Sequence, residues 1–234
     1  MTAELIDAGI ASAQGKGTTD RCAPRPLSLF GQVPNESSDP IVNPNPHFVR
    51  HRLDPCCWVD RVDRLILGAD ALFDLVAARF VWEQGRRLMY GKWMDEPRLT
   101  TRLELDDGRV PPVVGEAIEV LEQYYQRRFS GLFCNFYRDG DDGVAWHADR
   151  IGQSKVDPLV AIISLGGPRM FVMRDRSLTG QRKTSTTWPL HTGDLLVMGG
   201  ATQHHWEHSV PKHKRAPARI SLTTRASSRL PVVD

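Results

Sequence analysis

The chain has 234 residues, of which 41% are hydrophobic and 25% are charged. This composition is typical of a soluble globular protein, and the length suits one domain with a tail. No apolar run approaches the roughly 20 residues of a membrane span, and the acidic start of the chain differs from a secretory signal. Four cysteines without CxxC spacing indicate reduced thiols. We therefore expect a cytoplasmic monomer with no membrane partner.

The formal net charge is only +2, but the basic residues are unevenly spread along the chain. Residues 169–225 hold ten Lys and Arg against three Asp and Glu, a local excess of seven positive charges. A basic C-terminal part fits a polyanionic partner such as nucleic acid. The alternative is an ordinary solvated surface, which the charge count alone favours.

The first part of the chain predicts a flexible extension followed by two helices. Residues 1–46 are rich in Gly, Ser, Thr, Pro and Asn without a hydrophobic period, which predicts a flexible N-terminal extension to a single domain over residues 47–234. A helix is predicted from Asp70, with this residue as its N-cap. The clearest helix runs over residues 112–129, with proline in its first turn and apolar side chains at helical spacing.

Beyond that helix, short alternating segments are separated by turn signals such as Asp139-Gly140 and Gly166-Gly167-Pro168. Eight short strands after a helix predict a mainly β protein with flanking helices, folded as a double-stranded β-helix (jelly-roll) barrel over about residues 132–225. The predicted strands are residues 132–138, 144–149, 159–165, 169–174, 184–189, 194–198, 204–209 and 217–225.

A candidate metal site lies in the run His147-Ala148-Asp149. Residues i and i+2 of a strand point to the same face, so this imidazole and carboxylate are placed to bind one ion. A third ligand must come from elsewhere, and the best candidate is His208, with His204 and His205 as rivals. Two histidines and one carboxylate on one face of a metal form the ligand set of non-haem Fe(II) oxygenases.

Polar side chains on two further strands are suited to a dicarboxylate. Arg219 and Arg225 stand at the two ends of the alternating run RISLTTR, and Asn135 and Tyr137 share a face of another strand. A guanidinium binds a carboxylate through two parallel N–H groups, and amide and phenol groups donate beside it. The alternative for each arginine is an exposed charge on a strand.

These elements occur in an order that resembles the AlkB family of Fe(II)/2-oxoglutarate-dependent dioxygenases, over about residues 70–225. The phrases PRLT, FCNFYR and WEHSVPK are most similar to the subgroup that repairs alkylated DNA and RNA. The resemblance implies that His147, Asp149 and His208 are the catalytic Fe(II) ligands, and WEHSVP selects His208 over its neighbours. It also implies 2-oxoglutarate and O2 as cosubstrates, with Arg219 on the distal carboxylate of 2-oxoglutarate. Cosubstrate-binding roles follow for Asn135, Tyr137 and Arg225.

The resemblance further places a nucleotide-recognition lid at about residues 80–103. Interleaved aromatic and basic side chains there are suited to bases and phosphates, although ordinary aromatic packing explains them equally well. Arg150 stands where related sequences often carry an acid that touches the target base, which leaves base recognition open. The candidate nucleic-acid-binding residues are Trp82, Tyr90, Trp93, Arg98, Arg150, Lys212, Lys214 and Arg215.

The implied reaction is oxidative demethylation of N-alkylated bases, such as 1-methyladenine and 3-methylcytosine, in single- or double-stranded DNA or in RNA. It releases formaldehyde and serves the repair of alkylation damage. A related oxygenase acting on tRNA or protein is the alternative. A zinc deaminase is disfavoured because the tripeptide ends in Asp and no Pro-Cys-x-x-Cys follows it. A non-catalytic jelly-roll module leaves the retained ligands and arginines unexplained.

Overall fold

The computed structural model describes residues 39–89, 91–149, 157–176 and 184–229. The chain divides into two units, Met1–Asn35 and Glu36–Asp234, and all described residues belong to the second. Two of the predicted nucleic-acid contacts, Tyr90 and Arg150, lie outside the described residues.

The helices and strands alternate along the chain much as the sequence pattern predicts. The helices are α1 (Ala69–Arg79), α2 (Pro112–Tyr125) and the short α3 (Thr202–His205). The early strands are β1 (Ile41–Val42), β2 (Val49–Arg52), β3 (Cys57–Val62), β4 (Ile66–Leu67), β5 (Glu83–Met89) and β6 (Lys92–Leu103). The later strands are β7 (Arg127–Tyr137), β8 (Val144–His147), β9 (Val160–Gly166), β10 (Arg169–Asp175), β11 (Ser185–Leu190), β12 (Leu195–Gly200), β13 (Trp206–Val210) and β14 (Arg219–Arg229).

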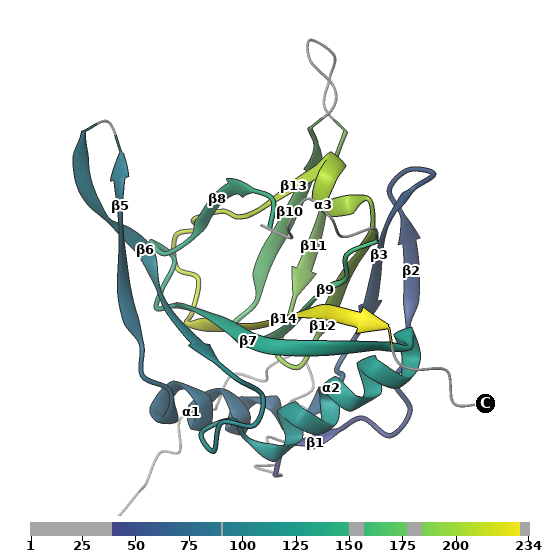
Figure 1. Cartoon of the computed structure of the whole chain (residues 1–234). Helices are drawn as coiled ribbons and strands as arrows, with labels where there is room; N and C mark the ends of the chain where they lie inside the picture. Colours follow the sequence, from purple (N-terminus) through teal and green to yellow (C-terminus); the bar gives the residue numbers. More distant parts are fainter. Residues whose placement is uncertain (1–38, 90, 150–156, 177–183, 230–234) are drawn as a thin grey trace, which may run out of the picture. The chain divides into compact units, whose positions relative to one another are not determined.

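In the described part of the chain, the strands form two principal antiparallel sheets. The larger has the order β2-β3-β12-β9-β14-β7-β6-β5 and the smaller the order β11-β10-β13-β8, with β1 and β4 as a separate pair. Figure 1 shows α1 and α2 along one face of the larger sheet, with the smaller sheet on its other side. The predicted fold class, a mainly β jelly-roll with flanking helices, is confirmed.

Two apolar cores follow from this layering. One lies between the helices and the larger sheet, where Leu121 of α2 and Leu222 of β14 are fully or almost fully buried. The other lies between the two sheets and includes Tyr137, Ile162 and Phe171. Burial of these large apolar side chains is the main stabilising contribution, at about 25 cal/mol for each Å² removed from water.

Strand β14 connects the two sides because its side chains alternate. Ile220 and Leu222 belong to the core under the helices, whereas Arg219, Ser221 and Thr223 line a pocket between the sheets. On the neighbouring β7, Phe136 packs on the helix side and Tyr137 faces inward. The period of two in the sequence therefore places polar groups inside the barrel mouth and apolar groups beneath the helices.

The structure corrects several predicted boundaries. The N-cap of helix α1 lies two residues earlier than predicted: it is Gly68, which has a positive φ of 67°, and Asp70 lies in the first turn. Helix α2 ends at Tyr125 because Gln126 adopts a left-handed conformation, and β7 follows at once. Residues 202–205 form α3, so the strand predicted from residue 204 begins at Trp206.

The segment assigned to the N-terminal extension includes an ordered part. Strand β1 pairs with β4, and the Asn43 N–H donates to the Leu65 carbonyl at 2.8 Å. Residues from 39 onward therefore belong to the folded unit, eight residues before the predicted boundary. No helix among the described residues is long and apolar enough to cross a bilayer.

Candidate active site

Strand pairing between β8 and β13 brings the predicted metal ligands together. His147 and His208 are directly opposite in the register, and their ring centroids are 4.3 Å apart. Asp149 follows two residues after His147, and its backbone N–H donates to Gln203 Oε1 at 2.9 Å. One ligand atom from each of the three side chains lies within 4.8 Å of the others. The structure therefore groups the three residues that the sequence pattern proposed.

Both imidazoles present a free ring nitrogen to the same place. His147 Nδ1 lies 2.8 Å from the Ala145 carbonyl, and a carbonyl only accepts, so Nδ1 carries the proton and Nε2 is left for a metal. His208 is buried and its ring stacks on Phe171 with centroids 5.1 Å apart. Burial lowers the pKa of His208 to about 4, so its imidazole is neutral near pH 7 and ready to coordinate.

The carboxylate of Asp149 is held in its charged form by its neighbours. Burial alone raises its pKa, but His208 and Arg225 outweigh burial and hold the pKa below its ordinary value. Arg225 Nη2 donates to Asp149 Oδ1 at 2.6 Å, while Asp149 Oδ2 lies 3.8 Å from His208 Nε2. Arg225 does not line the pocket itself. Its predicted contact with a cosubstrate stays a prediction, and the structure places it behind the carboxylate.

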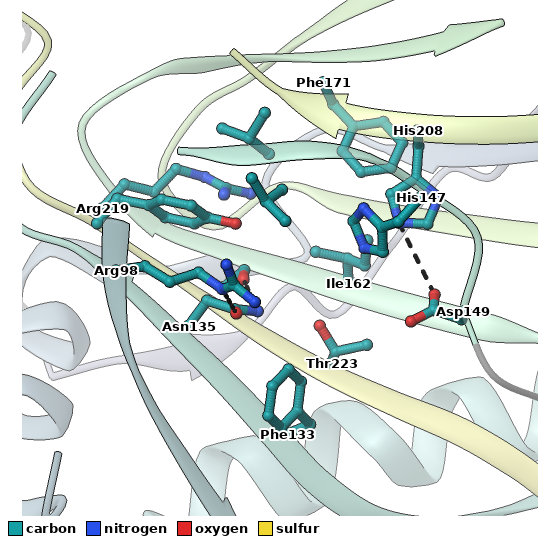
Figure 2. Close-up of a pocket in the computed structure, with 14 residues that line it drawn as sticks. Arg98, Phe133, Asn135, His147, Asp149, Ile162, Phe171, His208, Arg219 and Thr223 are labelled. Carbon is teal, nitrogen blue, oxygen red and sulfur yellow. Dashed lines mark hydrogen bonds and ion pairs between the residues drawn. The ribbon is translucent and has the colours of Figure 1, made fainter. Parts of the chain in front are cut away.

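The inner pocket, the cavity enclosed by the metal-ligand cluster, β7 and β14, contains a buried cation at its far end. Figure 2 shows His147, His208 and Asp149 at one end and Arg219 at the other. Arg219 is 1% exposed, and its Nε donates to Ser164 Oγ at 2.9 Å. Its Nη1 has no hydrogen-bond partner among the described residues. A buried guanidinium without a counter-ion is costly, so this end of the pocket is suited to an anion.

Further polar groups line the inner pocket between its two ends. Asn135 Oδ1 accepts from Arg98 Nε at 2.8 Å, and Asn135 Nδ2 donates to Ser221 Oγ at 3.3 Å. Tyr137 is 2% exposed, and the Arg219 guanidinium lies 5.4 Å from its ring centroid. Arg98 therefore lines the inner pocket, although the sequence analysis predicted it as a nucleic-acid contact. The cosubstrate-binding residues predicted there were Asn135, Tyr137 and two other arginines. Ser221 was also missed, although its spacing of two from Arg219 was a usable signal.

A second, more open pocket adjoins the first and is called the outer pocket. It has a volume of about 480 Å³, against about 60 Å³ for the inner pocket. The two share Arg98, Val144, His147 and Val210, so the outer pocket opens directly beside a metal-ligand candidate. Its cationic side chains are Arg87, Arg98 and Lys212, and no acidic side chain among the described residues lines it.

The predicted nucleic-acid residues fall into two groups. Arg98 and Lys212 line the outer pocket, and Trp93 is 62% exposed on the β5–β6 hairpin, which projects from the sheet in Figure 1. Trp82 instead packs between Phe80 and Phe136 and donates to the Ala77 carbonyl at 3.1 Å, which is the packing alternative. Lys214 and Arg215 are exposed on the loop after Lys212 without lining either pocket.

The sequence analysis did not single out two residues in or beside the outer pocket. Trp146 lies on its wall, 36% exposed, with the Arg174 guanidinium 4.1 Å from its ring centroid. Arg169 is buried and donates to the carbonyls of Asp139, Asp142 and Pro211, so it ties together two loops at the mouth. Trp146 could have been predicted at the site because it directly precedes His147. The role of Arg169 could not, because its three carbonyl partners are brought together only by the fold.

The residues present fit a non-haem iron and a dicarboxylate. Two imidazoles and one carboxylate without sulfur suit Fe(II) and leave coordination positions for other ligands. The unpaired Nη1 of buried Arg219 supplies the charge that a distal carboxylate needs. A site with a redox metal at one end and a carboxylate receptor at the other is that of a 2-oxoglutarate oxygenase.

Comparison with known proteins gives the same class. Residues 92–225 match the family described as the 2OG-Fe(II) oxygenase superfamily, and the chain belongs to it. Membership implies Fe(II), 2-oxoglutarate and O2, and the His147-Asp149-His208 cluster is compatible with them. Within the superfamily, the chain is similar to proteins named as AlkB homologs.

The mouse alpha-ketoglutarate-dependent dioxygenase alkB homolog 3 is 33% identical over 188 residues, which are 73% of this chain and 65% of that protein. The Arabidopsis thaliana DNA oxidative demethylase ALKBH2 is 36% identical over 131 residues, or 46% of this chain and 42% of that one. The solved structure of OsALKBH1 covers 76% of this chain and 100% of its own, with TM-score 0.50 and 15% identity, and supports the fold. The chain spans 61–65% of the length of the alkB homolog 3 proteins that it matches.

Proposed function

We propose that this protein is an Fe(II)- and 2-oxoglutarate-dependent dioxygenase that demethylates N-alkylated bases in DNA or RNA, as a repair of alkylation damage. The observation that carries the chemistry is the inner pocket, with His147, Asp149 and His208 at one end and the unpaired Nη1 of Arg219 at the other. The relatives named as a DNA oxidative demethylase support the nucleic-acid substrate.

In this proposal each side chain has a defined task. His147 Nε2, His208 Nε2 and an Asp149 oxygen hold the iron, and Arg225 keeps the Asp149 carboxylate charged and oriented. Arg219 holds the distal carboxylate of 2-oxoglutarate. When bound, Fe(II) with 2-oxoglutarate and O2 supplies an oxidant that hydroxylates a C–H bond, while 2-oxoglutarate becomes succinate and CO2.

The substrate enters through the outer pocket. Arg87, Arg98 and Lys212 give its walls a positive charge for a phosphate backbone, and Trp146 offers a flat surface for a base. A base held beside His147 has its N-methyl group next to the metal site. Hydroxylation of that methyl gives a hydroxymethyl amine, which breaks down to the free base and formaldehyde. A base paired in a duplex must first leave the stack, which costs a few kcal/mol.

The test is a panel of oligonucleotides carrying 1-methyladenine or 3-methylcytosine in single-stranded DNA, duplex DNA and RNA. Each is incubated with Fe(II), ascorbate and 2-oxoglutarate, and the product mass is measured together with succinate and formaldehyde. We expect a product lighter by one CH2 and equal amounts of demethylated base, succinate and formaldehyde. The Asp149→Ala protein is the control and should give none of the three.

A second set of substrates separates the alternatives. Methylated tRNA and methylated peptides are assayed under the same conditions. Demethylation of tRNA or peptide with no turnover of the DNA and RNA oligonucleotides would replace the repair proposal with the alternative oxygenase. Succinate formation that no nucleic acid stimulates, with no loss of CH2 from any oligonucleotide, would contradict the proposed substrate and leave the iron chemistry standing.

A further inference from the structure

A second cluster of metal-binding side chains lies at the turn between β2 and β3. Asp54, Cys56, Cys57 and His205 each offer one ligand atom, and these atoms lie within 4.8 Å of one another. Asp54 and Cys56 come from the turn, Cys57 is the first residue of β3, and His205 is the last residue of α3. This cluster shares no residue with the His147-Asp149-His208 cluster.

The distances in the cluster match those of a tetrahedral zinc site. A zinc with Zn–S near 2.3 Å and Zn–N near 2.05 Å has its sulfurs about 3.8 Å apart and each sulfur about 3.6 Å from the nitrogen. In the structure, Cys56 Sγ and Cys57 Sγ are 3.8 Å apart, and they lie 3.5 and 3.7 Å from His205 Nδ1. Asp54 Oδ1 lies 3.2 Å from Cys56 Sγ, somewhat nearer than the corresponding tetrahedral edge. The side chains thus already surround a position for one ion.

The surrounding hydrogen bonds hold this arrangement in place. The Trp206 indole N–H donates to Asp54 Oδ2 at 2.8 Å, and the Cys56 backbone N–H donates to Asp54 Oδ1 at 2.9 Å. The Ala201 N–H donates to the Cys56 carbonyl at 2.9 Å, which joins the turn to the segment before α3. Outer contacts of this kind orient metal ligands and fix their geometry. They leave the two sulfurs and His205 Nδ1 pointing at one another.

The chemistry of the cluster indicates a soft cation. The sulfurs are too far apart for a disulfide, whose S–S bond is about 2.05 Å, and both cysteines are free thiols. Thiolate sulfur is a soft ligand that selects zinc over hard cations such as calcium and magnesium. Cys57 is buried, but Cys56 and His205 are exposed, so an ion reaches the cluster from solvent.

We propose that Asp54, Cys56, Cys57 and His205 form a zinc site that is separate from the iron site. Two thiolates with an imidazole and a carboxylate favour zinc, whereas the cluster around His208 has no sulfur donor. The ion joins the β2–β3 turn to the residue directly before β13, the strand that carries His208. Its role is structural, because all four positions of the tetrahedron are filled by side chains.

Cobalt absorption separates this site from the iron site. Metal-free, tag-free protein is titrated with Co²⁺, and a thiolate bound to cobalt gives an intense charge-transfer band in the near ultraviolet. The iron site has no sulfur and gives no such band. Every protein carries Cys22→Ser, so that Cys56, Cys57 and the core residue Cys134 are the thiols that remain. In the Asp149→Ala protein, whose iron site lacks its carboxylate, we expect a band that saturates at one Co²⁺ per chain and disappears when one equivalent of Zn²⁺ is added.

The test variants replace the two exposed ligands, because substitutions at exposed positions leave the folded core intact. Cys56→Ser and His205→Ala should weaken zinc binding at least tenfold and reduce the cobalt band, while His204→Ala, the exposed neighbour, should match the parent. Asp149→Ala should keep the band, so a failed oxygenase proposal and a failed zinc proposal are distinguishable. A parent protein without the band, or a band that Cys56→Ser and His205→Ala leave unchanged, would overturn the proposal.

Discussion

Replacing Arg219 with lysine should separate cosubstrate binding from the rest of the site. Lysine keeps the positive charge but offers a point charge in place of the planar fork. The side chain is 1% exposed, its Nε is taken by Ser164 Oγ at 2.9 Å, and its Nη1 is unpaired. A carboxylate bound by two N–H groups of Arg219 would keep only one such bond with lysine.

The expected magnitude follows from the lost bond. A hydrogen bond to a charged group contributes about 1.5–3 kcal/mol. At about 1.4 kcal/mol for each factor of ten, Arg219→Lys should weaken 2-oxoglutarate binding by about 10- to 100-fold. Ser164 Oγ also loses its donor, which should lower the free energy of unfolding by about 1 kcal/mol. The KM for an oligonucleotide should stay within about twofold, because Arg219 does not line the outer pocket.

The assay measures succinate at varied 2-oxoglutarate, with urea unfolding as the stability readout. Arg169→Lys is the matched control, because Arg169 is also buried and lies at the same 5.4 Å from the Tyr137 ring centroid. It bonds three backbone carbonyls outside the inner pocket, so its loss should reduce stability and leave the 2-oxoglutarate KM nearly unchanged. An Arg219→Lys protein with the parent KM for 2-oxoglutarate would refute the reasoning. The next candidate for the carboxylate would then be Arg98, the other arginine of the inner pocket among the described residues.

Three more predictions test other parts of the site. His208→Ala should abolish turnover while circular dichroism shows a folded protein, whereas His204→Ala should keep turnover. Arg225→Met should weaken Fe(II) binding by about 10- to 100-fold through Asp149, with the 2-oxoglutarate KM unchanged; a raised KM for 2-oxoglutarate would assign Arg225 to the cosubstrate. Alanine at three exposed cations should flatten the slope of log affinity against log salt by about two units on single strands, whereas alanine at three exposed cations away from the pockets should flatten it less. The first set is Lys212, Lys214 and Arg215, and the control set is Arg52, Arg79 and Arg109.

The strands were predictable because their signal is local. The run from Arg219 to Arg225 alternates polar and apolar side chains, and this period alone places Ile220 and Leu222 beneath the helices. The order of the strands in the sheet was not predictable, because it depends on pairing between distant segments. Strand β3 pairs with β12, more than 130 residues further along the chain, and no local pattern indicates that partner. The position of the β5–β6 hairpin at the sheet edge depends on the same long-range pairing.

Alternation gives the face of a side chain but not its partner. By parity, Arg225 shares a face with Arg219, which predicts that both reach the cosubstrate. The pairing of β14 with β7 shifts between Thr223 and Arg225, next to Gly131, which has a positive φ of 63°. The pairing of β14 with β9, on its other side, stays regular through Arg225, so this side chain keeps the inward face and contacts Asp149 there. The local sequence gives the face of Arg225 correctly, and the position of Asp149 decides which group the guanidinium binds.

The three histidines between α3 and β13 show why residue type alone could not assign the ligands. His204, His205 and His208 lie within five positions of one another, and by the residues alone all three were candidates for the same metal. The helical turn of α3 ends at His205, whose ring faces two cysteines, and the extended backbone from Trp206 carries His208 to His147. The backbone changes from helical to extended at Trp206, and this change directs the imidazoles of His205 and His208 to two different clusters of ligands. If both clusters bind ions, the absence of sulfur around His208 and its presence around His205 keep iron and zinc apart.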